Sequence, residues 1–448
     1  MNAETRHTAD KIDTPLVSVG IVGATELHIH FEGKYTCGAD DFSGKQTIQL
    51  HGNQMIWDGR RFDQIIFTPT ESDLCTFALE GVTIGIGFHW ERKERQVFRG
   101  QLRLVIDKGH IHAINILSVE DYLKSVISSE MSATASLQLL KAHAVISRGW
   151  LLAQIEKRKG ISTDSQPSYY RTEKGYIRWY DREDHTLFDV CADDHCQRYQ
   201  GITRQVSEKA EQAVNETAGE VLMHQGRICD TRFSKCCGGM MEEYSTCWED
   251  IEVDYLRVKT DRDSASQSFP DLTKEEETRR WIINSPSAFC NTTDRRILSQ
   301  VLNNYDQETT DFYRWKTTYT QEELSRLINE KLGIDLGCII ALRPIKRGKS
   351  GRICELEIVG ERQSITIGKE LEIRRVLSTS HLLSSAFVVD CTYTDDQHIP
   401  DAFTLHGAGW GHGVGLCQIG AAMMGEKGYN YKDILLHYYQ GATLKKIY

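Results

Sequence analysis

The chain has 448 residues, of which 40% are apolar and 26% are charged, and its formal net charge is -10. This length allows two or three domains with a large core. The acidic balance argues against a nucleic-acid partner, because phosphate binding needs clustered lysine and arginine. No stretch approaches the ~20 continuous apolar residues of a transmembrane helix, and the N-terminus shows no signal-peptide pattern. Thirteen scattered cysteines favour reduced thiols with a metal site over a secreted disulfide scaffold.

The first part of the chain, residues 16–117, is predicted to be rich in strands, after a disordered stretch over residues 1–15. Short runs of alternating apolar and polar residues flank the dipeptide Lys108-Gly109. Such a pattern is typical of strands joined by tight hairpin turns.

Two helices are predicted next. The first begins at Ser118, where Asp121 three residues later forms a capping box, and it ends near Glu130. The second covers residues 136–159 and is apolar almost all round until its last turn. We therefore expect it to be a buried helix at the centre of the fold.

The chain is predicted to form a core in two parts, residues 16–257 and 396–448, with an inserted or accessory segment over residues 258–395. Strands and helices come in blocks rather than alternating, which predicts an α+β fold. The C-terminal part carries a glycine-rich motif that we expect to return to the core. The elements expected late in the chain are a helix over 321–332 capped by Thr320 and Glu323, strands over 338–345, 352–359 and 364–374, and a helix over 430–439.

Glu130 is a candidate general acid. A carboxylate at a helix C-terminus faces the negative end of the helix dipole, which favours the protonated form that a proton donor needs. The following helix carries Lys141 and Arg148 on nearly one face, and Arg148 interrupts an apolar stripe. A buried cation needs a partner, and Glu130 is a candidate across the short connection. The alternative is a buried ion pair that only fixes the helices.

The glycine-rich motif has a glycine at every second position from 407 to 415 and leaves Trp410 and His412 as its main large side chains. It matches neither a dinucleotide fingerprint nor a phosphate loop. Glycines allow a ligand to approach the backbone closely, and a tryptophan beside such a groove suits stacking on a sugar ring. A glycine-packed strand in a crowded core is the alternative.

Histidines and cysteines gather in one short segment, at His185, Cys191, His195 and Cys196. Two imidazoles and two thiolates match the tetrahedral preference of zinc. Four protein ligands leave no open position, so we expect a structural zinc ion. The spacing is not that of a standard zinc finger, and an incidental grouping in a loop is the alternative.

A second cysteine pair, Cys236-Cys237, precedes the turn Gly238-Gly239. A thiol nucleophile needs a paired base, and His412 is the one candidate that the motifs supply. Catalysis by one of these thiols is a minor hypothesis.

Four motifs together resemble one family. The segments E-D-Y-L-K-S-V-I-S-S-E-M (120–131) and L-L-K-A-H-A-V-I-S-R (139–148) resemble E-D-Y-L-x-G-V-V-x-x-E-M and the L-K-A-Q-A-V-A-A-R that follows it. The segments G-W-G-H-G-V-G-L-C-Q-I-G-A (409–421) and H-Y-Y-Q-G (437–441) resemble G-W-G-H-G-V-G-x-S-Q-x-G-A and H-Y-Y-x-G-T. These are the patterns of the SpoIID/LytB family of bacterial cell-wall proteins.

The resemblance implies lytic cleavage of peptidoglycan glycan strands, particularly peptide-stripped ones, with Glu130 as the catalytic acid. One carboxylate suffices, because the sugar's own 6-hydroxyl closes a 1,6-anhydro ring. Some members are amidase enhancers, so the alternative is a non-catalytic wall-binding protein that stimulates an amidase. The resemblance also implies a place in the cell envelope or periplasm. The segment from Asp189 to Gly201, which contains Cys191, His195 and Cys196, is similar to a further family segment in which the His and Cys hold zinc in some members.

On this hypothesis Lys141 or Arg148 tunes Glu130, and residues of the later motifs contact the sugar. The expected substrate-binding residues are Lys141, Arg148, Gly238, Gly239, Glu242, Trp410, His412, Gln418 and Tyr438. The chain departs from the family pattern at the turn K-C-C-G-G (235–239), where the family has S-T-S-G-G. It also has Met241 in place of Thr, His143 in place of Gln and Cys417 in place of Ser.

Overall fold

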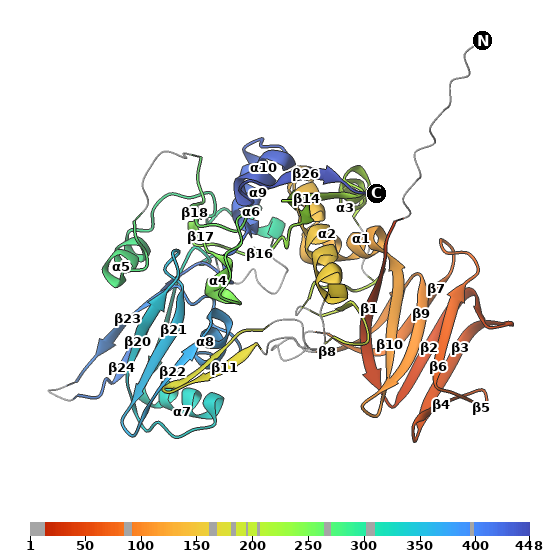
Figure 1. The fold of residues 1–448 in the computed structure, drawn as a ribbon, viewed down its shortest axis with the longest axis horizontal. Coiled ribbons are helices and arrows are strands. Elements are labelled where there is room, and N and C mark those ends of the chain that lie inside the picture. Colours follow the sequence, from red (N-terminus) through yellow and green to blue (C-terminus); the bar gives the residue numbers. More distant parts are fainter. Residues whose placement is uncertain are drawn as a thin grey trace, which may run out of the picture.

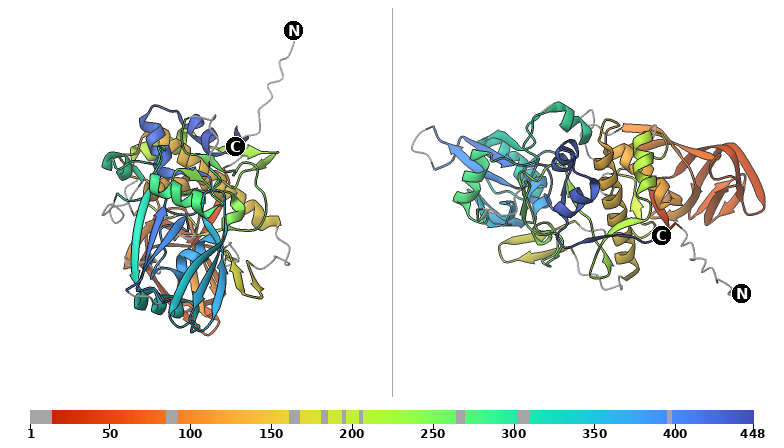
Figure 2. Two further views of the ribbon diagram at one scale, coloured as in Figure 1. Left: turned by 90° about the vertical axis from the view of Figure 1, so that its left-hand side faces the viewer. Right: turned by 90° about the horizontal axis from the view of Figure 1, so that it is seen from above.

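The computed structural model describes residues 14–84, 92–160, 168–180, 185–193, 196–203, 207–263, 270–301, 310–394 and 398–448, with backbone alone for 158–160. Two β-rich regions lie at opposite ends of the molecule, with a layer of helices between them (Figure 1). The view from above in Figure 2 shows the same order of parts. Strands and helices occur in blocks, so the expected α+β class is confirmed. Of the stretch expected to be disordered, residues 1–13 lie outside the described part.

Within the described residues, an 11-stranded sheet forms the N-terminal region, in the order β13-β1-β10-β9-β6-β2-β3-β4-β5, with β7 paired to β2 and β8 paired to β7. The hairpin predicted at Lys108-Gly109 joins β9 and β10, and both residues have positive φ, as a tight two-residue turn requires. The strand-rich prediction is therefore confirmed. The strands are β1 (Leu16–Ala24), β2 (Glu26–Cys37), β3 (Asp40–His51), β4 (Gln54–Trp57), β5 (Arg60–Phe62), β6 (Gln64–Pro69), β7 (Thr76–Ile84), β8 (Arg92–Phe98), β9 (Gln101–Asp107), β10 (His110–Ser118) and β13 (Val190–Cys191).

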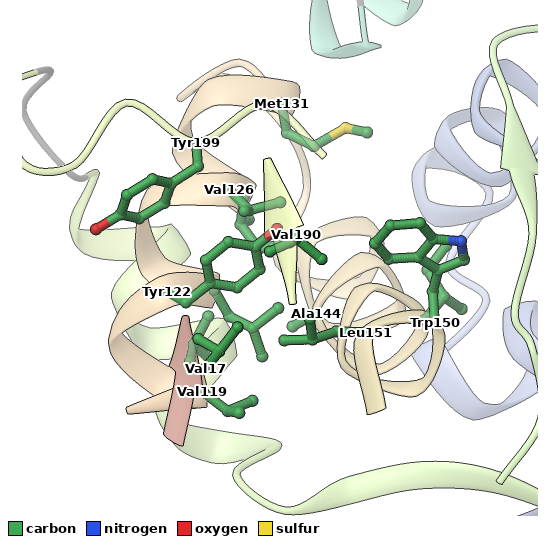
Figure 3. Packing of buried hydrophobic residues seen from close by; sticks show 14 of the residues in the cluster. Val17, Val119, Tyr122, Val126, Met131, Ala144, Trp150, Leu151, Val190 and Tyr199 are labelled. Atoms are coloured by element: carbon green, nitrogen blue, oxygen red, sulfur yellow. The ribbon is translucent and has the colours of Figure 1, made fainter. Parts of the chain in front are cut away.

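Helix α1 (Val119–Glu130) packs against β1 and β10 of this sheet, and helix α2 (Leu137–Gly160) packs beside α1. They confirm the two predicted helices. The Ser118 hydroxyl accepts the backbone N–H of Asp121 at 3.1 Å, which satisfies a donor of the first turn of α1. Every residue of α2 from 142 to 152 is buried, so α2 is the central helix that its composition predicts. Figure 3 shows side chains of both helices packing with residues of β1 and β13.

The second β-rich region has its own hydrophobic core, built from residues between Trp315 and Leu405. One sheet has the order β11-β12-β22-β21-β20 and a second has the order β19-β24-β23. Its strands are β11 (Tyr169–Thr172), β12 (Gly175–Arg178), β19 (Arg314–Thr320), β20 (Ile339–Arg347), β21 (Ile353–Gly360), β22 (Ser364–Gly368), β23 (Phe387–Thr392) and β24 (Ala402–Ala408), and its helices are α5 (Glu275–Asn284), α7 (Gln321–Leu332) and α8 (Glu370–Val376).

Two predictions for this region need comment. The strand expected over 364–374 is wrong in its second half, because β22 ends at Gly368 and Glu370–Val376 is helix α8. Ile373 and Val376, three residues apart, face the core from one side of this helix. The sheet formed by β19, β24 and β23 also continues beyond residue 395, where we expected the inserted segment to end.

The remaining elements connect the two β-rich regions. The segment around β16 pairs with the segment around β25, and isolated bridges join Cys236 to Trp410 and Glu242 to Val414. The glycine-rich motif of the C-terminal part thus lies beside the earlier K-C-C-G-G turn. Within the described residues, no helix is long and apolar enough to cross a membrane. The elements are α3 (Glu208–Glu216), α4 (Tyr244–Cys247), α6 (Arg295–Val301), α9 (Gln418–Glu426), α10 (Tyr431–Tyr438), β14 (Glu220–His224), β15 (Arg227–Ile228), β16 (Phe233–Ser234), β17 (Met240–Met241), β18 (Lys259–Thr260), β25 (Leu416–Cys417) and β26 (Thr443–Lys446).

Candidate functional site

Glu130 is the last residue of α1, and it is half-buried. Its Oε1 accepts the backbone N–H of Arg198 at 3.2 Å. Within the described part of the chain, its Oε2 accepts no hydrogen bond, no cationic side chain lies at ion-pair distance, and this oxygen is not sealed from solvent. The carboxylate is thus held at one oxygen and open at the other.

Arg148 pairs with Glu120 and not with Glu130. Its Nε and a terminal nitrogen donate to the two Glu120 oxygens at 2.8 and 2.7 Å, and the Arg148 side chain is 0% exposed. The expected pairing with Glu130 is therefore wrong, and the alternative, an ion pair that fixes the helices, describes Arg148 with a different acid. Lys141 is also engaged elsewhere, in an ion pair with Glu216.

The geometry of the helix pair explains this correction. Helices α1 and α2 are joined by a short connection, so positions at similar distances from that connection lie side by side. Arg148 is eleven residues into α2, about 16 Å along the axis, and Glu120 is ten residues back from the end of α1, about 15 Å. Glu130 lies at the connection itself, out of reach of Arg148.

Trp410 and His412 are both partly exposed. Trp410 stacks on Phe312 with ring centroids 5.0 Å apart and planes 10° from parallel, so one face of its indole is covered. His412 Nδ1 accepts the backbone N–H of Val414 at 3.0 Å. Desolvation and the nearby guanidinium groups, that of Arg232 first, hold the pKa of the His412 imidazole well below its usual range. His412 is therefore neutral, with one nitrogen already in use.

The glycine run surrounds a buried arginine. Arg352 is 0% exposed and donates to the carbonyl oxygens of Gly411 at 3.0 Å and Cys237 at 3.3 Å. A Cβ at Gly413 would lie 2.4 Å from the Arg352 Cζ, and Gly413 has φ +74°, a conformation that favours glycine. At this position the crowded-core interpretation is the right one.

Several expected substrate-binding residues are sealed in the interior. Gln418 and Tyr438 are each 1% exposed and Glu242 is 0% exposed. Gln418 Nε2 lies 2.9 Å from Nε2 of His143, and burial raises the pKa of Glu242, whose Oε2 accepts the Ser350 hydroxyl at 2.7 Å. These side chains, like Arg148, hold the interior together and do not line an open groove.

Gly238 and Gly239 have positive φ and lie against other parts of the chain. The Gly238 carbonyl accepts a terminal nitrogen of Arg314 at 3.0 Å, and a Cβ at Gly239 would lie 2.6 Å from the hydroxyl of Tyr313. The turn therefore makes a close backbone contact within the protein.

Helix α6 links the Glu130 connection to the Trp410 segment. The backbone N–H of Ser132 donates to the Gln300 carbonyl at 3.0 Å. At the end of the same helix, the Val301 carbonyl accepts the Lys235 ammonium at 2.9 Å, and the residue after Lys235 pairs with Trp410. Glu130 and Trp410, both of which are partly exposed motif residues, are therefore supported by the same helix.

Three of the four expected zinc ligands come together. Ligand atoms of His185, Cys191 and Cys196 lie within 4.8 Å of one another, and all three residues are partly buried. The fourth, His195, lies outside the described residues. This donor set of imidazole and thiolates fits zinc, which binds nitrogen and sulfur ligands at ~2.0–2.3 Å.

A second group that could hold a metal was not foreseen as a set. It consists of Cys237, Asp261, Cys290 and Cys417, whose ligand atoms also lie within 4.8 Å of one another. Cys237 and Cys417 stand where the family pattern has Ser, which marked two of the four positions. Nothing in the sequence marked Asp261 or Cys290.

Burial also removes the support for a thiol nucleophile. Cys236 is 0% exposed and Cys237 is 2% exposed. Desolvation raises the pKa of both thiols well above the usual range, so neither is a poised thiolate at the surface.

Comparisons with known proteins agree with the motifs. A model of the family described as Stage II sporulation protein, SpoIID, matches residues 107–224, and a domain of unknown function, DUF8618, matches residues 242–415. The chain is 27% identical over 328 residues to the amidase enhancer of Bacillus subtilis, a match that covers 72% of this chain and 40% of that protein.

Two further relatives match over more of their own length. The Stage II sporulation protein D of Bacillus subtilis is 22% identical over 336 residues, which cover 75% of this chain and 76% of that protein. An uncharacterized protein of Brachyspira hyodysenteriae is 24% identical over 347 residues, which cover 78% of this chain and 72% of that protein.

Proposed function

Because the chain belongs to the SpoIID/LytB family, a relation that supports a role at the cell wall, we propose that it is a peptidoglycan lytic transglycosylase of the cell envelope. Glu130 is its acid and base. The observation that carries the proposal is that, among the residues the structure describes, Glu130 keeps one carboxylate oxygen unpaired and open to solvent. The carboxylates of Glu120 and Glu242, the two other glutamates of the motifs, already accept hydrogen bonds from the buried side chains of Arg148 and Ser350.

The reaction needs one group that gives and then takes a proton. Protonated Glu130 donates its proton to the bridging glycosidic oxygen as the bond from the anomeric carbon to that oxygen breaks. The 6-hydroxyl oxygen of the same muramyl sugar then bonds to the anomeric carbon and returns its proton to the Glu130 carboxylate. No water is consumed, so the two carboxylates of an ordinary glycoside hydrolase are not required.

Sugar contacts fall to the motif residues that remain partly exposed. Trp410 is braced by Phe312 on one face, which leaves the rest of the indole to stack on a pyranose ring. Neutral His412 contributes polarity without charge. Lys141 is 15% exposed at its side chain and is tied to Glu216, so it is a weaker candidate for binding the strand.

The decisive experiment incubates the purified chain with peptide-stripped glycan strands and identifies the products by mass spectrometry. We expect 1,6-anhydro-muramyl ends from the native chain and none above background from Glu130→Gln. Glu330→Gln, an exposed glutamate on α7, is the matched control and should cleave as the native chain does. Equal cleavage by Glu130→Gln would rule out this role.

Zinc belongs to the same proposal as a structural ion. His185, Cys191 and Cys196, together with His195, would hold it with no open position. A zinc ion there would fix the conformation of the segment that precedes Arg198. The backbone N–H of Arg198 donates the hydrogen bond to Glu130. Removing the ion should loosen that hydrogen bond rather than change the chemical step.

Stimulation of an amidase is the second candidate function. The relative named amidase enhancer favours it, and so does the burial of Arg148, Gln418 and Tyr438, which leaves few motif side chains for a substrate. It predicts faster release of stem peptides when the chain is added to a cell-wall amidase, with Glu130→Gln equally effective. If Glu130→Gln abolished this stimulation, a purely binding role would be excluded.

A further inference from the structure

Four side chains from four separate segments meet in the interior beside the glycine-rich motif. They are Cys237 after β16, Asp261 after β18, Cys290 after α5 and Cys417 at the end of β25. None of the four residues is more than 2% exposed. We propose that this group, called here the buried thiol cluster, is a structural binding site for a thiophilic divalent metal ion, with Zn²⁺ as the expected ion.

The sulfur spacing fits tetrahedral coordination. Sγ of Cys237 lies 3.6 Å from Sγ of Cys290. Zinc–sulfur bonds of ~2.3 Å in a tetrahedral site place neighbouring sulfurs about 3.8 Å apart, whereas a disulfide needs ~2.05 Å. The two thiols therefore already have the separation that a shared zinc ion requires, and they would have to move to form a disulfide.

Asp261 supplies the argument from charge. A buried carboxylate needs a cation or a metal to compensate for lost hydration. Within the described residues, no lysine or arginine lies at ion-pair distance from Asp261, and the nearest cationic candidate, Nε2 of His437, is 3.7 Å from Oδ1. A divalent ion would give the Asp261 carboxylate a counter-charge and would let the thiols bind it as thiolates, with release of their protons.

Hydrogen bonds around the cluster are of the kind that orient metal ligands. The Tyr438 hydroxyl donates to Oδ1 of Asp261 at 2.9 Å, and the backbone N–H of Cys290 donates to Oδ2 at 3.0 Å. The backbone N–H of Cys237 points at the sulfur of Cys417, 3.2 Å away. This gives Tyr438 a role as a support for the cluster, in place of the sugar contact that its motif suggested.

The donor set has a clear chemical preference. Thiolates select soft or borderline ions such as zinc over magnesium or calcium, and three thiolates with one carboxylate complete a tetrahedron. Cys237 and Cys417 replace serines of the family pattern, and hydroxyls are poor zinc ligands. The two replacing cysteines, Cys237 and Cys417, come from separate segments and lie beside Cys290. A metal ion bound by all three would link the glycine-rich motif to the segment before α6.

The test measures metal on the full chain, purified without a metal-binding tag. The variant Cys191→Ser with Cys196→Ser, which disables the other metal group, should retain about one equivalent of zinc, with X-ray absorption showing a sulfur-rich shell. Adding Cys237→Ser and Cys290→Ser should remove it. The matched controls Cys75→Ser and Cys354→Ser, each at a buried thiol outside the cluster, should leave the metal content unchanged.

Two results would overturn the proposal. One is a folded Cys191→Ser, Cys196→Ser variant that contains no zinc and takes up none when Zn²⁺ is added. The other is a Cys237–Cys290 disulfide in the native chain, found by alkylating the denatured protein without reductant and mapping its peptides. If the four-cysteine variant does not fold, Co²⁺ loaded into the two-cysteine variant decides, because thiolate-to-cobalt absorption bands are expected and their absence counts against the site. No outcome depends on glycan cleavage.

Discussion

The two ends of α1 carry the same residue type in opposite situations. Glu120 lies in the first turn, and its carboxylate accepts hydrogen bonds from two nitrogens of the buried Arg148. It also accepts the Tyr448 hydroxyl at 2.6 Å and the Gly219 N–H at 3.2 Å. Glu130, the last residue, accepts a hydrogen bond from one backbone N–H, and within the described part of the chain its other carboxylate oxygen has no partner. One helix thus has an anchoring carboxylate and an available carboxylate, and we expect substitutions at its two ends to separate stability from activity.

The first and largest prediction concerns the available carboxylate. Glu130→Gln should lower the rate of anhydro-end formation by on the order of 10²–10⁴-fold, the usual contribution of a positioned acid or base. The free energy of unfolding should change by less than about 1 kcal/mol, because no ion pair is lost. Product release on peptide-stripped strands and urea denaturation measure the two quantities. Loss of folding in this variant would contradict the comparison.

The second prediction concerns the anchor. Arg148→Met leaves Glu120 in a buried position without its cation, and we expect the free energy of unfolding to fall by about 3–5 kcal/mol. Combining it with Glu120→Gln should recover part of the loss, since no charge is then left unpaired. Urea denaturation of the two variants decides. A double variant as unstable as Arg148→Met would mean that packing, and not the unpaired charge, dominates.

The third prediction concerns His143, a buried residue of α2 that is neutral, whereas Arg148 on the same helix is charged. Burial, with a smaller contribution from Lys235, lowers the pKa of His143 from 6.5 to about 3. Between these values the unfolded chain binds a proton that the folded chain does not, so this residue's contribution is complete above pH 6.5 and is lost as pH falls toward 3.

Unfolding curves at several pH values test this linkage. His143→Gln, which restores the residue of the family pattern, should reduce the pH dependence by at most about 1.4 kcal/mol per pH unit inside that window. Above the window the variant should show no change in slope. Identical pH profiles for the native chain and His143→Gln would show that the pKa of His143 is the same in the folded and unfolded chain, and would contradict the prediction.

The smallest expected effect is at the start of α1. Ser118→Ala removes the acceptor of the Asp121 N–H and should cost about 1 kcal/mol of stability. Ser118→Thr keeps a capping hydroxyl and is the control. Both variants should cleave glycan strands at the native rate, because the cap lies at the anchoring end. Thermal unfolding and product analysis check the two parts.

The sequence predicts the helix caps and the hairpin turn correctly, because the contacts that determine them join residues close together in the chain. The Ser118 cap of α1 and the capping box of Thr320 and Glu323 on α7 involve residues three positions apart. The hairpin at Lys108-Gly109 depends on two residues with positive φ. The prediction of a strand over the whole of 364–374 was wrong, because an apolar pattern of this length fits either a strand or a short helix. The packing of Ile373 and Val376 in the core selects the helix.

The sequence by itself determined the α+β class, the buried α2, the position of Glu130 at the end of α1 and the resemblance that leads to the cell wall. Only the tertiary structure decided that Arg148 belongs to Glu120, that Gln418 and Tyr438 are interior residues, and that Cys290 and Asp261 join Cys237 and Cys417. The physical reason is that caps, turns and helix periodicity depend on neighbours along the chain. Ion pairs and metal ligands depend on which distant segments the packed core brings within a few ångströms of each other.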